Sequence, residues 1–119
     1  MLDEEAVRRQ ILGGVVQGIG GSLYERLAYD ESGQPLVATL ADYAVPRAPQ
    51  VPPIEIVRIE TPSPHNPLGL KGAGESGCMA VYAALAAAVE DALAERGCRV
   101  WALPLPAAEI WAMLHRDHG

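Results

Sequence analysis

A stretch near the N-terminus that combines helical apolar spacing with several glycines constrains the fold of this chain more than any other feature. Between residues 4 and 26 an apolar residue recurs every four positions, at Val7, Ile11, Val15, Ile19 and Leu23. This spacing predicts an amphipathic helix. Five glycines lie within it: Gly13, Gly14, Gly18, Gly20 and Gly21. Because each glycine costs a helix interior up to about 1 kcal/mol, we expect another backbone to pack closely against them.

The middle of the chain predicts β structure. Residues 27–40 form two apolar arms around the turn-rich tetrad Asp30-Glu-Ser-Gly33, which is typical of a hairpin. Residues 44–53 contain four prolines and predict a rigid, extended connection. Residues 54–60, Ile-Glu-Ile-Val-Arg-Ile-Glu, alternate apolar and charged side chains, which predicts a half-buried strand. A loop rich in proline and glycine follows over residues 61–77.

The last third predicts two further helices. Residues 79–96 are rich in alanine, and Gly97 stands where a helix C-cap favours glycine. After an extended piece around residues 99–103, Pro106 is suited to open a final helix with Ile110, Trp111 and Leu114 on its inner side. The sequence therefore predicts a single, compact α+β domain over residues 1–119, with a hairpin and a further strand packed against two or three helices.

Charge and hydropathy exclude several classes of function. The chain has 119 residues and a formal net charge of −6, which argues against nucleic-acid binding because phosphate contacts need clustered Lys and Arg. The first residues are acidic and lack the apolar stretch of a secretory signal. The longest apolar run, over residues 78–89, is shorter than the roughly 20 residues that span a bilayer. We expect a cytoplasmic protein that does not enter a membrane.

The two cysteines are not expected to form a disulfide. Cys78 and Cys98 lie on either side of the helix predicted over residues 79–96. If this helix is straight, its ends lie about 30 Å apart, well beyond the roughly 7 Å between Cα atoms that a disulfide allows. Neither cysteine belongs to a C-x-x-C pair, so thiolate metal binding is not expected either.

The glycine-rich stretch around Glu75 is the strongest candidate for a site. Gly72, Gly74 and Gly77 surround this carboxylate just before a predicted helix. Glycines let a ligand approach the main chain, and a helix N-terminus favours negative charge, so the loop suits an anionic cofactor with an acid or base beside it. A structural role is the alternative: Ser76 as an N-cap and Glu75 as a charge on the helix dipole. The residues alone leave both open, and caps are the commoner case.

Four other patterns fail as functional motifs. Cys78 occupies the last glycine position of a G-x-S-x-G elbow, and Leu23 occupies the last glycine position of G-x-G-x-x-G. His115 and His118 form an H-x-x-H pair without further metal ligands. His65 stands alone in the loop and is read as a turn residue.

Several segments in order resemble the xanthine dehydrogenase, aldehyde oxidase and aerobic carbon monoxide dehydrogenase family. They are Gly13-Gly-Val-Val-Gln-Gly-Ile-Gly-Gly-Ser-Leu-Tyr-Glu25, Tyr29-Asp-Glu-Ser-Gly33, Asp42-Tyr43, Thr61-Pro-Ser-Pro-His-Asn-Pro-Leu-Gly69, Lys71-Gly-Ala-Gly-Glu-Ser-Gly77, and the closing Pro104-Leu-Pro106 and Ile110-Trp111. The match covers nearly the whole chain. The chain resembles the C-terminal segment of the molybdopterin-binding large subunit of this family. Within the family it is most similar to bacterial carbon monoxide dehydrogenase-like and aldehyde oxidase-like proteins.

The resemblance implies part of a molybdenum hydroxylase. In the family the metal is held by molybdopterin, usually as the cytosine dinucleotide in bacteria, and the glutamate of K-G-x-G-E is the general base. Carried across, Glu75 is that base, and Lys71, Gly72, Ala73 and Gly74 line the cofactor. The resemblance implies iron–sulfur and FAD subunits as partners. It does not specify whether the substrate is carbon monoxide, an aldehyde or an N-heterocycle.

Three residues, at two places in the chain, depart from the family pattern. Leu12 stands where relatives often have Glu in Q-x-E-G-G, which questions the contacts of the first helix. Val81-Tyr82 replaces a usual small residue and proline, which predicts a narrower pocket.

The resemblance covers only a fraction of a family large subunit. We therefore expect the chain to be inactive and to bind no cofactor alone, and to work only with the remaining large-subunit portion. In this hypothesis the glycine face of the first helix meets the missing portion, or a second copy in a homodimer. The alternative is a non-catalytic remnant that serves as a binding or oligomerisation module.

Overall fold

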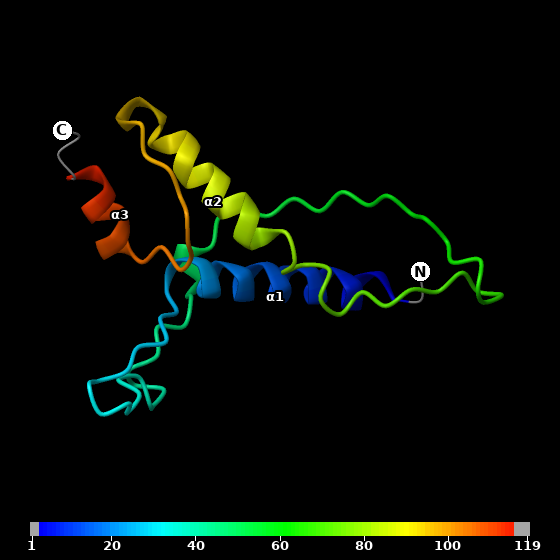
Figure 1. Ribbon diagram of the computed structural model, residues 1–119. Coiled ribbons are helices and arrows are strands. Elements are labelled where there is room, and N and C mark those ends of the chain that lie inside the picture. The colour runs from blue at the N-terminus through cyan, green and yellow to red at the C-terminus, as the bar shows by residue number, and fades with distance from the viewer. Residues whose placement is uncertain (1–2, 116–119) are drawn as a thin grey trace.

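Three helices in an open arrangement make up the structure, a computed structural model that describes residues 3–115. Helix α1 spans Glu4–Leu23, α2 spans Val81–Ala92 and α3 spans Ala107–Leu114. Two short 3-10 helices, η1 (Ala48–Gln50) and η2 (Ala94–Arg96), lie between them. Long loops leave the α1–α2 pair on both sides (Figure 1). None of the helices in the described residues is long and apolar enough to cross a membrane.

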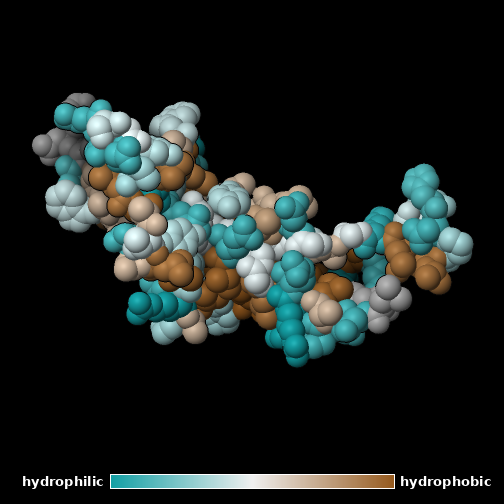
Figure 2. Space-filling view, turned by 90° about the horizontal axis from the view of Figure 1, so that it is seen from below, coloured by the Kyte–Doolittle hydropathy of each residue, from teal (hydrophilic) through white to brown (hydrophobic). Residues whose placement is uncertain are grey.

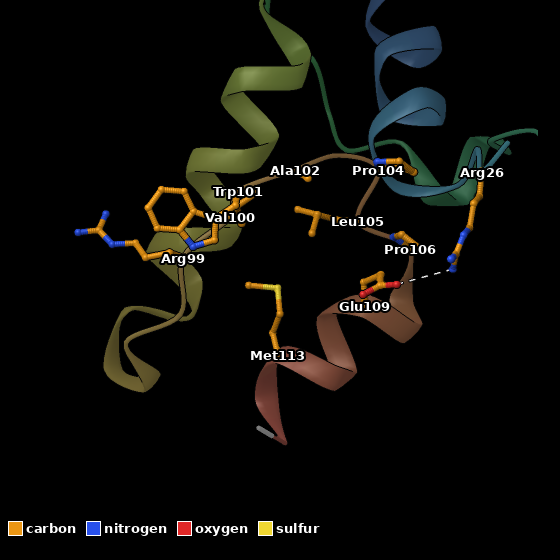
Figure 3. Close-up of a pocket in the computed structure, with 10 residues that line it drawn as sticks. All are labelled: Arg26, Arg99, Val100, Trp101, Ala102, Pro104, Leu105, Pro106, Glu109 and Met113. Carbon is orange, nitrogen blue, oxygen red and sulfur yellow. Dashed lines mark ion pairs between the residues drawn. The ribbon is translucent and has the colours of Figure 1, made fainter. Parts of the chain in front are cut away.

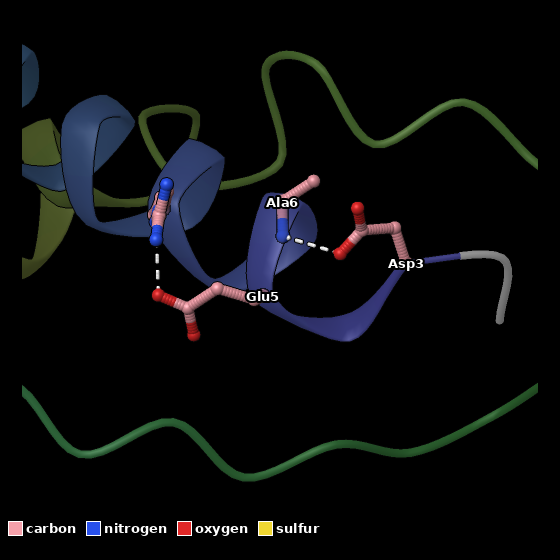
Figure 4. A network of polar contacts seen from close by, with 4 residues as sticks. Asp3, Glu5 and Ala6 are labelled. Atoms are coloured by element: carbon pink, nitrogen blue, oxygen red, sulfur yellow. Dashed lines mark hydrogen bonds and ion pairs between the residues drawn. The ribbon is translucent and has the colours of Figure 1, made fainter.

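Helix α1 begins where the sequence provides a cap. The Asp3 side chain accepts a hydrogen bond from the Ala6 amide at 2.9 Å (Figure 4). Glu5 and Arg9, one turn apart, form an ion pair of 2.9 Å on the exposed face. The helix ends at Leu23, three residues before the predicted limit at residue 26, and the Tyr24 amide closes it on the Gly20 carbonyl.

The glycine face of α1 packs against this chain's own second helix. A Cβ built on Gly18 would lie 2.6 Å from Cβ of Val81, and one on Gly21 would lie 2.7 Å from the Tyr82 hydroxyl. The expected close approach of another backbone occurs at Gly14, where an added Cβ would lie 3.0 Å from the main chain of Gly77 and Cys78. At Gly18 and Gly21 the close neighbours are instead side chains of α2. Much of the glycine face therefore packs within this chain, whereas Gly13 stays open.

A small apolar core joins the C-terminal third to the end of α1. Cys98, Leu105 and Met113 are buried together, with Leu23, Val89, Leu93, Val100, Leu103 and Ile110 packed around them. The Leu105 amide donates to the Ser22 carbonyl at 2.6 Å, which ties this core to α1. Gly97 closes η2 with a left-handed φ of 64°, as its position predicts, and Pro106 precedes the first residue of α3.

The predicted α+β fold is wrong, because residues 3–115 contain no sheet. The expected hairpin over residues 27–40 reduces to one isolated antiparallel bridge between Tyr29 and Pro35. The turn itself is present, since Gly33 has φ of 83° and Asp30 caps it. A two-stranded hairpin gains little without a third strand or a helix against its face. Here Leu36 and Leu40 are exposed, so nothing covers the arms.

The predicted strand over residues 54–60 is also absent. This segment runs as an extended arc, green in Figure 1, with no partner strand among the described residues. It lies against the N-terminal half of α1, where Arg58 forms an ion pair of 3.3 Å with Glu4. Alternating side chains favour an extended backbone, but a strand exists only when a second backbone pairs with it.

The chain is not compact in the way a domain of its length is. Its radius of gyration is 18.3 Å, against about 13–14 Å expected for 119 residues. Large apolar side chains stay exposed, among them Leu40, Val57, Ile59, Leu68 and Trp101. Apolar patches are interspersed with polar ones over the face shown in Figure 2. So much exposed apolar surface is typical of a chain that contacts further protein.

The turn at Asp30 predicts a measurable pH dependence. Hydrogen bonds, first from the Ser32 side chain and then from the Gln34 amide, lower the pKa of the Asp30 carboxyl. A lowered pKa stabilises the turn above the ordinary aspartate pKa of about 4, and this stabilisation is lost as the pH falls through the lowered value. An NMR titration should give Asp30 a lower midpoint in the chain than in a denatured sample. Equal midpoints would contradict the turn geometry.

Candidate functional site

The first half of the loop, residues 61–70, is held by its own hydrogen bonds. The Asn66 side chain both accepts from the Leu70 amide at 2.8 Å and donates to the Leu70 carbonyl at 2.9 Å. The Ser63 amide donates to the Gly69 carbonyl at 3.1 Å, and Gly69 has φ of 63°. His65 donates its amide to the Ser63 hydroxyl at 3.2 Å, which agrees with its interpretation as a turn residue. This half is a self-contained turn structure.

The second half, residues 71–77, is anchored on α1. The Gln10 side-chain amide donates to the Gly74 carbonyl at 2.8 Å, across 64 positions of sequence. Gly77 is buried directly against the main chain of α1, where an added Cβ would lie 2.9 Å from both Cα and the carbonyl carbon of Ile11. Gly14 faces the same contact, at 3.0 Å from the main chain of Gly77 and Cys78. The first helix therefore positions the loop that carries Glu75.

The five predicted site residues lie together on the open side of this anchored loop. Lys71, Gly72, Gly74 and Glu75 are exposed, and Ala73 is half-buried. A Cβ on Gly72 or Gly74 would meet nothing within 4 Å, so the main chain there is open to a ligand. The Lys71 ammonium donates to the Thr61 hydroxyl at 2.9 Å, which closes the base of the loop.

The Glu75 carboxylate points to no partner within the described part of the chain. No hydrogen bond or ion pair of its side chain occurs there, whereas its main-chain carbonyl accepts from the Cys78 amide at 3.1 Å. An exposed carboxylate beside open glycine backbone can accept a proton or bind a polar group.

The alternative role of Ser76 as an N-cap is wrong. Helix α2 begins at Val81 with Ala80 as its N-cap residue, and no side chain caps it. Ser76 instead donates its hydroxyl to the Ala73 carbonyl at 2.9 Å, within the loop. Glu75 therefore lies outside the first turn of α2, which begins at Val81. It is not a charge of that first turn that stabilises the helix dipole.

The residues that depart from the family pattern face α1. Val81 and Tyr82 pack on the glycines of that helix, as described above, and Leu12 is half-buried within it. Tyr43 also contacts this region, because its hydroxyl donates to the side chain of Glu25, just beyond the end of α1. This hydrogen bond raises the pKa of the Tyr43 hydroxyl. Of these side chains, Val81 and Tyr82 form the contact of α2 with α1, at Gly18 and Gly21.

Sequence reasoning missed Gln10 as a positioning residue. The sequence contains a signal for it, because Gln10 is the first residue of Gln10-Ile-Leu-Gly-Gly14 and matches the first position of the family pattern Q-x-E-G-G. Gln10, Ile11 and Gly14 of this short segment all contact the loop of Glu75.

The other sequence candidates form no site in the described residues. No group of three His, Cys, Asp or Glu residues there could hold a metal ion. Cys78 and Cys98 are free, as predicted. The His115 ring stacks on Trp111 with centroids 4.1 Å apart, and His118 lies outside the described residues.

A separate hollow of about 360 Å³ lies between α3 and the segment that precedes it (Figure 3). Trp101, Leu105 and Met113 line it, and Arg26 and Glu109 form an ion pair of 3.6 Å at its edge. No residue of the loop over 61–77 contributes to it, so it is not part of the Glu75 site.

Comparison with known proteins gives consistent matches. Residues 1–52 match the model of the molybdopterin cofactor-binding domain. The chain is 45% identical over 104 residues to the nicotine 6-hydroxylase large subunit of Paenarthrobacter nicotinovorans, which covers 87% of this chain and 13% of that protein. It is 34% identical over 113 residues to the carbon monoxide dehydrogenase large chain of Hydrogenophaga pseudoflava, covering 95% of this chain and 14% of that one.

A solved structure agrees with both. Quinoline 2-oxidoreductase from Pseudomonas putida 86 superimposes with a TM-score of 0.91 at 40% identity, over 98% of this chain and 15% of that one. The chain belongs to the family of molybdopterin-binding large subunits. It corresponds to a segment of such a subunit, since it spans about one seventh of the relatives it matches.

Proposed function

We propose that this chain is the part of a molybdenum hydroxylase large subunit that supplies the general base, Glu75. The observation that carries the proposal is the loop over residues 71–75, which α1 holds in place while its carboxylate and glycine backbone stay open. The family assignment supports it, because the matched proteins include a nicotine 6-hydroxylase large subunit, a carbon monoxide dehydrogenase large chain and a quinoline 2-oxidoreductase.

The residues of the loop fit a flat, polar cofactor. Gly72 and Gly74 leave space at the main chain, Ala73 adds only a methyl group, and Lys71 supplies a positive charge at the base. We propose that these four residues line a molybdopterin group, in the cytosine dinucleotide form. When bound, this group supplies the two-electron oxidation of the substrate carbon.

The protein itself supplies the base of the proposed reaction, which is the Glu75 carboxylate. It accepts a proton from the oxygen that is transferred to the substrate, and the fixed loop holds it in place for that transfer. Anchoring at both Gly74 and Gly77 restricts its main chain on either side, so little freedom is lost when substrate binds. The substrate class that we propose is a small aldehyde, N-heterocycle or carbon monoxide.

The proposed chain works only in an assembly. A loop of five residues exposes most of a large cofactor to water, so the rest of the pocket must come from the remaining large-subunit portion. We propose iron–sulfur and FAD subunits as the electron acceptors of that assembly. For this chain alone, we propose neither activity nor cofactor binding.

A non-catalytic remnant, acting as a binding module, is the alternative. The exposed apolar side chains suit it equally well. The open, partner-free carboxylate of Glu75 favours the catalytic role, because a module that only binds protein has no need of it.

The mass and molybdenum content of the native complex distinguish the two functions. We expect the chain to elute from its own cells with molybdenum, in a complex far heavier than a small homo-oligomer. A molybdenum-free complex, or the chain by itself, would favour the remnant and contradict the catalytic proposal.

A further inference from the structure

Residues 54–60 have the side chains of a strand but no second strand beside them. Glu55, Val57 and Ile59 alternate with Ile54 and Ile56, and the segment runs extended beside the N-terminal half of α1. Among the described residues, the main-chain groups of these five residues take part in no backbone hydrogen bond.

The two faces of this segment differ in what they contact. Ile54 and Ile56 lie toward α1, where they line a hollow of about 230 Å³ with Val7 and Ile11. Val57 and Ile59 face away and are 81% and 89% exposed. An exposed pair of β-branched apolar residues next to unpaired main chain is what an edge strand shows before another strand joins it.

We propose that residues 54–60 pair, as a β-strand, with one strand from the remaining portion of the large subunit. This inference rests on the proposed function, since it takes that portion as the partner. The length of the matched relatives points to this partner, because about six sevenths of each lies outside this chain. A strand added there pairs with the main chain of residues 54–57 and 59, and side chains of the same sheet cover Val57 and Ile59.

Hydrogen exchange tests the pairing directly. We compare the full chain by itself with the native complex purified from its own cells, and follow the amides of residues 54–57 and 59. In the chain alone they should exchange fast. In the complex every second amide should be slowed at least about tenfold, because successive amides of a strand point to opposite edges.

Proline substitutions give a second readout with a matched control. Val57→Pro and Ile56→Pro each remove one amide hydrogen, and the extended backbone accepts proline. Hydrogen exchange identifies which of these two amides is protected in the complex. At that position the proline variant should assemble at least about tenfold more weakly than the alanine variant, which keeps the amide hydrogen. At the other position the proline and alanine variants should assemble equally well.

The outcomes separate this inference from the proposed function. A native complex in which residues 54–59 exchange as fast as in the free chain would overturn the strand and leave the proposed function in place. A chain that elutes without large-subunit partners would contradict both. Slow exchange in the chain alone, with the mass of a dimer, would show that a second copy covers the segment and would overturn the choice of partner.

Discussion

Replacing Glu75 by glutamine should reduce turnover of the assembled enzyme by about 10²–10⁴-fold, the range that a general base contributes. Glutamine has nearly the same shape as glutamate but does not accept the proton. Because the side chain is exposed and makes no hydrogen bond or ion pair within the described residues, the substitution should leave folding and assembly intact. Turnover is measured in the complete complex, together with its mass and molybdenum content.

A matched control separates the base from a general effect of charge. Glu95 is an exposed carboxylate in η2, well separated in the sequence from the loop, so Glu95→Gln removes the same charge and should leave turnover unchanged. Full turnover in Glu75→Gln, with normal assembly, would remove the base assignment. Lost turnover accompanied by lost molybdenum would instead indicate that Glu75 acts in holding the cofactor.

Replacing Gly77 by alanine should strongly destabilise this chain. The added methyl group would collide with the main chain of Ile11, and backbone atoms on a helix cannot move aside as a flexible side chain can. Overpacking of this kind costs about 1–3 kcal/mol, and we expect the upper end. The loop would also be pushed off α1, two residues from Glu75. Thermal unfolding and turnover of the complex measure the two effects.

Gly13 provides the control for this substitution. It lies in α1 beside the buried glycines, yet an added Cβ there would meet nothing within 4 Å. Gly13→Ala should therefore stabilise the helix by up to about 1 kcal/mol through propensity alone. If Gly77→Ala and Gly13→Ala have the same effect on unfolding, the close contact between the loop and α1 is not present.

Local signals predicted the helices well, because helices are built from contacts a few residues apart. The four-residue apolar spacing placed α1 from Glu4, and Gly97 marked the end of the second helical stretch. The exact limits were less accurate, since α2 begins at Val81 and ends at Ala92. The free cysteines followed from the same helix geometry.

The β predictions failed for a physical reason. A strand needs a partner far along the chain or in another polypeptide, and the alternation over residues 54–60 carries no information about whether that partner is present. The hairpin failed in the same way, since Asp30 and Gly33 form the turn while the arms lack a surface to pack on.

The sequence by itself determined the helix positions, the glycine-rich loop with its single carboxylate, and the family resemblance, because each depends on residue type and local spacing. Only the tertiary structure decided what those residues contact. It placed α2 on the glycine face of α1, turned Val81 and Tyr82 toward that face, and anchored the Glu75 loop through Gln10 and Gly77. These contacts join residues more than sixty positions apart, and close approach between such distant segments depends on how the whole chain packs.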